Sequence, residues 1–410
     1  MEMFVKKCSC LSIISLITTL PALSCICIWA LIVILAGYTE TGYSIQPDSN
    51  GRCFGFLVAF GDSLTDTGNA QRIFPLQQRR AGMHPYGQTF FRRPCDRFSD
   101  GRLLIDFIAQ ALQLPFLDPY VKGAGSSFLH GVNLATSGAT VTNVTFLVPY
   151  TLKVQLYWLK KVKANIVQSL QSPVVLQSLP TLDSFNKALY VVWIGGNDYN
   201  AQFFIHGMKI DELMKSVRRV INTMSSDLEV LYQEGARAIL VVNLPPVGCT
   251  PQLLTFVRGH SDEYDSVGCY KPFNKVLQAH NALLRELLRN LTQLHPDAAF
   301  IYADYYSIAY HILQHPSNYG MFDVLNSCCG AGGSYNFNIT TQCGMSIELN
   351  ASLPIPIPVA CLNPAIFSNW DGIHPTEALT QIVAAAFLAG QYLEPANAFS
   401  NCTFDMTGFL

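Results

Sequence analysis

The stretch F-L-V-A-F-G-D-S at residues 56–63 decides the fold prediction for this chain. Its first five residues are apolar without alternation, which is typical of a short strand buried on both faces of a parallel sheet. The run stops at Gly61, and Asp62 and Ser63 are predicted to lie in a turn that opens the next helix. A serine there has an exposed hydroxyl and a free peptide N–H, although a plain helix cap is the commoner role.

Three more apolar runs share this character, and helical patterns separate them. Apolar residues recur at three- and four-residue steps over 213–231 and 276–291, and a last helix is predicted from about Pro375 to Ala389, ended by Gly390. This alternation predicts a doubly wound α/β sheet, whose ligands bind beyond the carboxyl ends of the strands. The three runs are L-Y-V-V-W-I at 189–194, A-I-L-V-V-N at 238–243 and A-F-I-Y-A-D at 299–304.

An acid and a histidine lie three residues apart in D-G-I-H-P at 371–375. In a tight turn before a helix, both side chains can point into the cleft. His374 could then take the proton of Ser63 while Asp371 orients the imidazole. The plainer interpretation of either residue alone is a capping acid and a surface histidine.

Two further loops supply hydrogen-bond donors for an oxyanion. G-G-N-D at 195–198 follows a predicted strand and offers the amide of Asn197, and N-L-A-T-S-G-A-T at 133–140 offers the peptide N–H of Gly138. Taken singly, each loop is an ordinary turn. The sequence contains no G-x-S-x-G, so the nucleophile elbow of the α/β-hydrolases is missing and a Ser–Asp–His order requires another scaffold.

Composition narrows the class of partner. Half of the 410 residues are hydrophobic, 13% are charged and the formal net charge is -2. This balance predicts a folded protein and gives no electrostatic footprint for nucleic acid. One α/β pattern without a linker predicts a single domain over 50–395, followed by a tail at 396–410.

The first 37 residues are predicted to be a targeting segment. Lys6 and Lys7 precede a largely apolar stretch that ends near Gly37. The short basic start favours a cleaved secretory signal peptide, and the length also allows a retained anchor. We therefore expect a secreted protein that contacts a membrane only if this segment is kept.

Cysteines and sequons agree with secretion. Nine of the 13 cysteines lie after this segment, which implies several disulfides and at least one free thiol. A zinc site is the weaker alternative for the late cluster, which lies in a Gly-, Asn- and Pro-rich stretch (326–361) predicted to be a stapled loop. The disulfide candidates are Cys249, Cys269, Cys328, Cys329, Cys343 and Cys361, and the glycosylation candidates are Asn143, Asn290, Asn338, Asn350 and Asn401.

Four stretches, which follow one another along the chain in the order of the family's blocks, resemble the plant-type GDSL esterase/lipases, a family of SGNH hydrolases. Four others, P-Y-G-Q-T-F-F at 85–91, R-F-S-D-G-R-L-L-I-D-F-I-A at 97–109, L-P-P-V-G-C-T-P at 244–251 and C-C-G-A-G-G-S-Y-N-F-N at 328–338, also look like that family. The resemblance covers roughly 54–395. The four blocks are F-G-D-S-L-T-D-T-G-N at 60–69, G-V-N-L-A-T-S-G-A-T at 131–140, G-G-N-D at 195–198 and D-G-I-H-P-T at 371–376.

The resemblance implies a flavodoxin-like three-layer α/β/α fold with a central parallel sheet of about five strands. It also implies a catalytic triad of Ser63, Asp371 and His374, and an oxyanion hole made by Ser63, Gly138 and Asn197. No cofactor or metal is implied. The expected substrate is a short-chain or acetyl ester of a sugar, polysaccharide or small metabolite, with a lipid ester second, and the expected location is the cell wall or apoplast. Acyl transfer by the same triad and a non-catalytic binding role are the alternatives.

Overall fold

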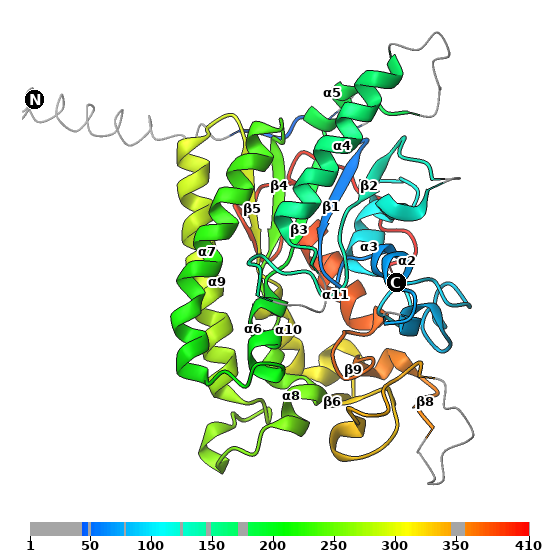
Figure 1. The fold of residues 1–410 in the computed structure, drawn as a ribbon, viewed down its shortest axis with the longest axis vertical. Coiled ribbons are helices and arrows are strands. Elements are labelled where there is room, and N and C mark those ends of the chain that lie inside the picture. Colours follow the sequence, from blue (N-terminus) through cyan, green and yellow to red (C-terminus); the bar gives the residue numbers. More distant parts are fainter. Residues whose placement is uncertain are drawn as a thin grey trace, which may run out of the picture. The chain divides into compact units, whose positions relative to one another are not determined.

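The apolar run after Phe56 forms strand β1, which lies inside a six-stranded sheet in the computed structural model (Figure 1). The strand order is β10-β5-β4-β3-β1-β2, with β10 antiparallel to β5 and all other neighbours parallel. The β2-β1-β3-β4-β5 part is the flavodoxin-like order, so the predicted fold class is confirmed. The strands are β1 Leu57–Gly61, β2 Gly131–Asn133, β3 Leu189–Trp193, β4 Ala238–Val242, β5 Ala299–Ala303 and β10 Leu393–Glu394.

The structure describes most of the chain after residue 42. The predicted signal segment at 1–37 and the sequon at Asn350 lie outside the described residues. Within the described part, no helix has both the length and the apolar character that a membrane crossing requires. The described ranges are 43–47, 51–77, 79–123, 126–144, 149–170, 179–345 and 357–409.

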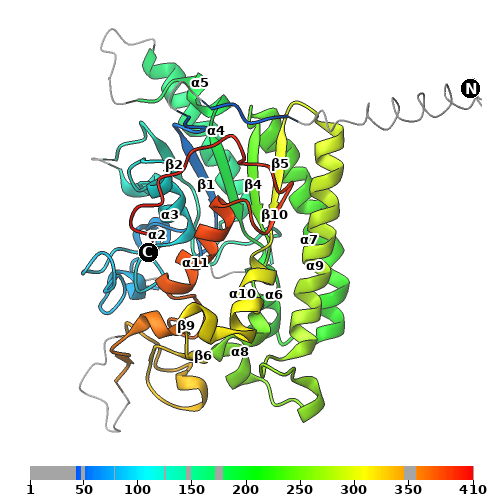
Figure 2. The same cartoon turned by 180° about the vertical axis from the view of Figure 1, so that it is seen from behind.

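Helices cover both faces of the sheet, because alternate residues of each buried strand point to opposite sides. Val58 and Phe60 face a core shared with α4, α7 and α9, while Leu57 and Ala59 face a core shared with α3, α10 and α11. Figure 1 shows the first group of helices, and Figure 2 shows the sheet from behind. The helices are α2 Asn69–Ile73, α3 Leu104–Ala111, α4 Leu152–Leu170, α5 Leu182–Asn186, α6 Gly196–Phe204, α7 Ile210–Gln233, α8 Pro251–Phe256, α9 Lys271–Leu294, α10 Tyr305–Gln314 and α11 Glu377–Leu388.

The predicted strands and helices are confirmed, and the ends of the strands agree with the prediction within a residue or two. The stripe over 213–231 lies in α7, the stripe over 276–291 lies in α9, and α11 ends just before Gly390. The stretch after Asn326 is more ordered than a simple loop, because short strands pair within it and with the segment before the last helix. These are β6 Asp323–Ser327 with β9 Phe367–Asn369, and β7 Cys329–Gly330 with β8 Val359–Ala360.

The C-terminal segment at 396–410 belongs to the same compact unit as the sheet, which covers 44–410. Phe399 and Phe409 are buried in the core on the α3 side. A disulfide also joins Cys402 to Cys53, just before β1. The end of the chain is therefore fastened beside the strand that leads to Ser63.

Candidate active site

The turn that carries Ser63 begins where β1 ends. The peptide N–H groups of Thr65 and Asp66 donate to the Asp62 carbonyl, which closes a single turn. We predicted that Ser63 would open a helix, and this is wrong: α2 begins only at Asn69. The helix starts later because Gly68 has a positive φ of 132° and the Asp66 carboxylate accepts the N–H groups of Asn69 and Ala70 in the first turn.

Ser63, His374 and Asp371 form a continuous hydrogen-bonded row. The Nε2 atom of His374 is 2.8 Å from Oγ of Ser63, and Nδ1 is 2.8 Å from Oδ2 of Asp371. Asp371 and His374 are 2% and 4% exposed. Burial alone would raise the pKa of Asp371, but the charge of His374, its hydrogen bond and Arg80 hold this pKa well below its ordinary range. Asp371 is therefore an anion that can stabilise an imidazolium.

Two aromatic residues that the sequence analysis did not select complete the surroundings of this row. The hydroxyl of Tyr86 donates to Oδ2 of Asp371 at 2.7 Å, and Tyr86 is fully buried. The ring of Phe98 lies against the imidazole of His374, with centroids 5.0 Å apart. The only sequence signal for either residue was its place in a family-like stretch. Their contacts restrict how the carboxylate and the imidazole can turn.

A buried glutamine fixes the strand end that precedes Ser63. The Gln155 amide accepts from the N–H of Gly61 at 2.9 Å and donates to the carbonyl of Gly61 at 2.7 Å. Gly61 needs glycine, since its φ is 157° and a Cβ there would lie 2.6 Å from the carbonyl oxygen of Trp193. Helix α4 thereby holds the turn that carries Ser63 against the neighbouring strand.

The loop that carries Gly138 is held by two buried carboxylates. Oδ2 of Asp66 accepts the N–H of Ser137 at 2.8 Å, and Asp198 accepts the N–H groups of Val141 and Thr142. Burial raises the pKa of Asp198 to about 6, against the lowering effect of these hydrogen bonds. One acid follows β1 and the other follows β3, so the loop is fixed to both strand ends.

This arrangement leaves hydrogen-bond donors of Ser63, Gly138 and Asn197 available. Asn197, in the first turn of α6, donates one amide hydrogen to the carbonyl of Ala139 at 3.0 Å and keeps the other. In the described part of the chain, the peptide N–H groups of Ser63 and Gly138 have no protein acceptor. Two free N–H groups and a half-used amide are what a developing oxyanion requires.

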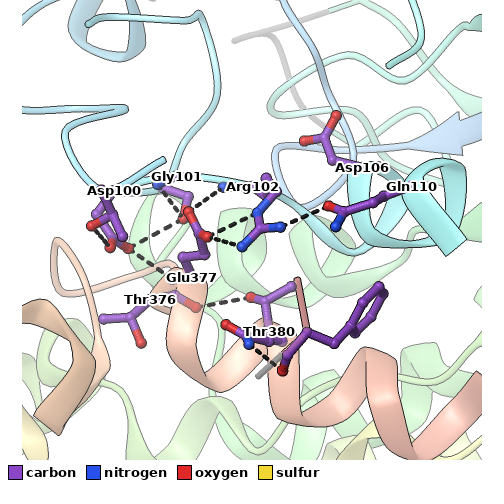
Figure 3. A network of polar contacts seen from close by, with 12 residues as sticks. Asp100, Gly101, Arg102, Asp106, Gln110, Thr376, Glu377 and Thr380 are labelled. Carbon is purple, nitrogen blue, oxygen red and sulfur yellow. Dashed lines mark hydrogen bonds and ion pairs between the residues drawn. The ribbon is translucent and has the colours of Figure 1, made fainter. Parts of the chain in front are cut away.

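An ion-pair network anchors the helix that follows His374 (Figure 3). The Glu377 carboxylate accepts the peptide N–H of Arg102 at 2.9 Å and its Nε at 2.8 Å, and both side chains are almost fully buried. Oδ1 of Asp100 accepts the N–H of Glu377 at 2.7 Å, while the hydroxyl of Thr376 caps the helix. The family-like stretch at 97–109 therefore positions the turn that carries His374.

A cleft of about 100 Å³ opens beside the triad. Ser63, Asn197 and His374 line it, while Gly138 does not. Its lining includes largely apolar side chains from β3, α10 and α11 and polar side chains from α6 and α8. The cleft lies at the carboxyl ends of β1 and β3, which is the point where the strand order reverses.

The structure pairs all six cysteine candidates. Cys249 bonds to Cys269, Cys328 to Cys361 and Cys329 to Cys343. No local pattern indicates the fourth bond, because Cys53 and Cys402 are 349 residues apart. Among the described cysteines, Cys95 alone is free. Asn143, Asn290 and Asn401 are exposed, and Asn338 is half-buried.

Comparisons with known proteins place the chain in one family. A family model described as GDSL-like lipase/acylhydrolase matches residues 57–387. A GDSL esterase/lipase of Arabidopsis thaliana is 37% identical over 88% of this chain and 94% of its own length. An esterase of Hevea brasiliensis is 34% identical over 83% of this chain and 87% of its own. A solved acetyl xylan esterase from Geobacillus stearothermophilus, with 16% identity and a TM-score of 0.34 over 82% of this chain and 94% of that one, is too distant to support an argument.

Proposed function

This chain belongs to the GDSL-like lipase/acylhydrolase family, and on that premise we propose that it is a secreted serine esterase for short-chain esters, acetyl esters included, of sugars or small metabolites. The observation that carries the proposal is the row from Ser63 through His374 to Asp371, with 2.8 Å at each contact. Nucleophile, base and orienting acid are within hydrogen-bond reach of one another.

The reaction would proceed by two acyl transfers. Oγ of Ser63 attacks the ester carbonyl carbon while its proton passes to Nε2 of His374, and the carbonyl oxygen becomes an oxyanion held by the free donors. When the carbon–oxygen bond to the alcohol breaks, His374 returns its proton to the leaving alkoxide. Water then attacks the acyl-enzyme, His374 takes the proton of the water, and Ser63 recovers it as the acid leaves.

Secretion is proposed on different grounds. Four disulfides suit an oxidising compartment, and exposed sequons at Asn143, Asn290 and Asn401 suit glycosylation there. The basic and apolar start of the chain supplies a signal peptide for this route, so we propose the cell wall or apoplast as the location. A retained start would instead bring the enzyme to a membrane.

Hydrolysis of p-nitrophenyl acetate, butyrate and palmitate by the purified mature protein tests the proposal. Ser63→Ala should lower turnover by several orders of magnitude, on the order of 10⁶ in subtilisin. Ser368→Ala is the matched control, because Ser368 lines the same cleft and its hydroxyl donates to the Val324 carbonyl. Equal rates in Ser63→Ala and the parent protein would overturn the serine mechanism.

A second measurement separates hydrolysis from acyl transfer. Both reactions use the same acyl-enzyme and differ in whether water or an alcohol takes the acyl group. We expect free acid as the main product when a competing alcohol is added. A dominant transesterification product would assign the protein to the acyltransferases, and no turnover of any ester would favour a binding protein.

A further inference from the structure

The cleft beside Ser63 has a part of its lining, from β3, α10 and α11, that is built mainly from buried apolar side chains. Trp193 and Leu379 contribute to it from β3 and α11, and each is at most 6% exposed. Ala309 and Leu313, one helical turn apart on α10, are 2% and 7% exposed and line the same cavity. The cavity therefore runs from the triad into the core on the α10 side of the sheet.

Apart from the hydroxyl of Tyr305, which lines the same cavity from α10, this wall offers a ligand nothing to hydrogen-bond. The indole N–H of Trp193 already donates to the carbonyl of Asn243 at 3.1 Å. A hydroxylated alcohol group buried there would lose its hydrogen bonds with water, while an alkyl chain would lose none. The remaining polar lining groups lie on other elements, among them Asn200 on α6, whose buried Oδ1 has no partner within the described residues, and Gln252 on α8.

The size of the cavity limits the chain. A cavity of about 150 Å³ holds benzene, which has six carbons, and the whole cleft, its polar side included, has about 100 Å³, so it accommodates an acyl chain of at most about four carbons. A palmitoyl chain is far longer, and an acetyl group would leave most of the pocket unfilled.

We propose that this apolar pocket is the acyl subsite of the enzyme and that it selects acyl chains of about four carbons, with Ala309 and Leu313 of α10 setting the length. The alcohol moiety lies on the polar side of the cleft. The inference rests on the proposed esterase function and narrows its substrate class from short-chain esters to butyryl-like esters.

The kcat/KM values for p-nitrophenyl acetate, butyrate, hexanoate and octanoate test the proposal. Two added methylene groups should favour butyrate over acetate by roughly 15-fold in the parent enzyme. In Ala309→Leu the new side chain fills most of the pocket, so this ratio should fall to about 1 to 2. Leu313→Ala should shift the optimum to hexanoate or longer.

Ala385→Leu is the matched control, because Ala385 packs against the same core from α11 but does not line the cavity. A parent enzyme that prefers acetate, or equal profiles for Ala309→Leu and Ala385→Leu, would overturn the proposal. A series of alkyl acetates is measured in parallel. If Ala309→Leu changes the alcohol preference there and leaves acyl selectivity intact, the pocket is an alcohol site and the assignment is wrong.

A binding measurement distinguishes a failure of the serine mechanism from a failure of the acyl subsite. Ser63→Ala cannot form the acyl-enzyme, but the acyl pocket remains in it. We expect butyramide to bind this variant and to lose its affinity when Ala309→Leu is added, as measured by calorimetry. Ester turnover that persists in Ser63→Ala would overturn the proposed function alone. An affinity for butyramide that is the same with and without Ala309→Leu would overturn the assignment of the acyl subsite.

Discussion

Replacing Tyr86 with phenylalanine removes one hydroxyl from the surroundings of Asp371 and should change both the rate and its pH dependence. The phenol donates to Oδ2 at 2.7 Å, and His374 Nδ1 contacts the same oxygen at 2.8 Å. Without the phenol, Oδ2 has the imidazole alone as its donor. The carboxylate becomes more basic and free to turn, although Oδ1 still accepts the N–H groups of Ile373 and His374.

The magnitude follows from the burial of both partners. A hydrogen bond to a charged group contributes about 1.5–3 kcal/mol. Tyr86 is fully buried and Asp371 is 2% exposed, so water cannot readily replace the phenol. If about half of this energy is lost in the transition state, kcat/KM falls roughly 4- to 13-fold. Loss of this donor also weakens the interactions that hold the pKa of Asp371 well below its ordinary range, so the carboxylate takes up a proton more readily. The ascending limb of the pH profile should therefore move to higher pH.

The assay is kcat and KM for p-nitrophenyl butyrate from pH 4 to 9, with thermal unfolding of each variant. Tyr190→Phe is the control, because the buried Tyr190 hydroxyl donates to the Phe185 carbonyl at 2.9 Å on the other side of the sheet. We expect the loss to fall on kcat in Tyr86→Phe, with a displaced ascending limb, and no displacement in Tyr190→Phe. An undisplaced profile with equal rate losses in both variants would refute a positioning role for Tyr86.

Two further predictions concern stability. Glu377→Leu leaves Arg102 buried without its carboxylate partner and should lower the free energy of unfolding, measured by urea titration, by about 3–5 kcal/mol. The double variant Arg102→Met with Glu377→Leu should recover most of this loss. A double variant that is no more stable than Glu377→Leu would contradict this account. Burial raises the pKa of Asp227 to about 6, and Oδ2 of Asp227 has no partner in the described structure. The protonated carboxyl therefore makes its full contribution to stability below about pH 4, and this contribution is lost as pH rises through 6. Asp227→Asn should therefore raise stability at pH 7 by about 1–2 kcal/mol and show no gain near pH 4, whereas a pH-independent change would exclude this carboxyl as the cause.

Local patterns in the sequence determined the central strands and the long helices. A strand buried on both faces must be apolar at every position, so β1, β3, β4 and β5 are visible without knowledge of their neighbours. The heptad-like stripes of α7 and α9 are equally local. Ser63, Asn197 and His374 could be selected for the same reason, since each lies in a polar turn directly after or before such an element.

Only the tertiary structure decided which distant residues act together. Strands β2 and β10 have three and two residues, too few for a pattern, and exist because an edge of the sheet is available to them. Tyr86 and Asp371 are 285 residues apart, and Arg102 and Glu377 are 275 apart. The length of the acyl pocket likewise depends on where α10 lies against β3. Side-chain contacts across such separations are set by how helices pack on the sheet, and no local periodicity records that packing.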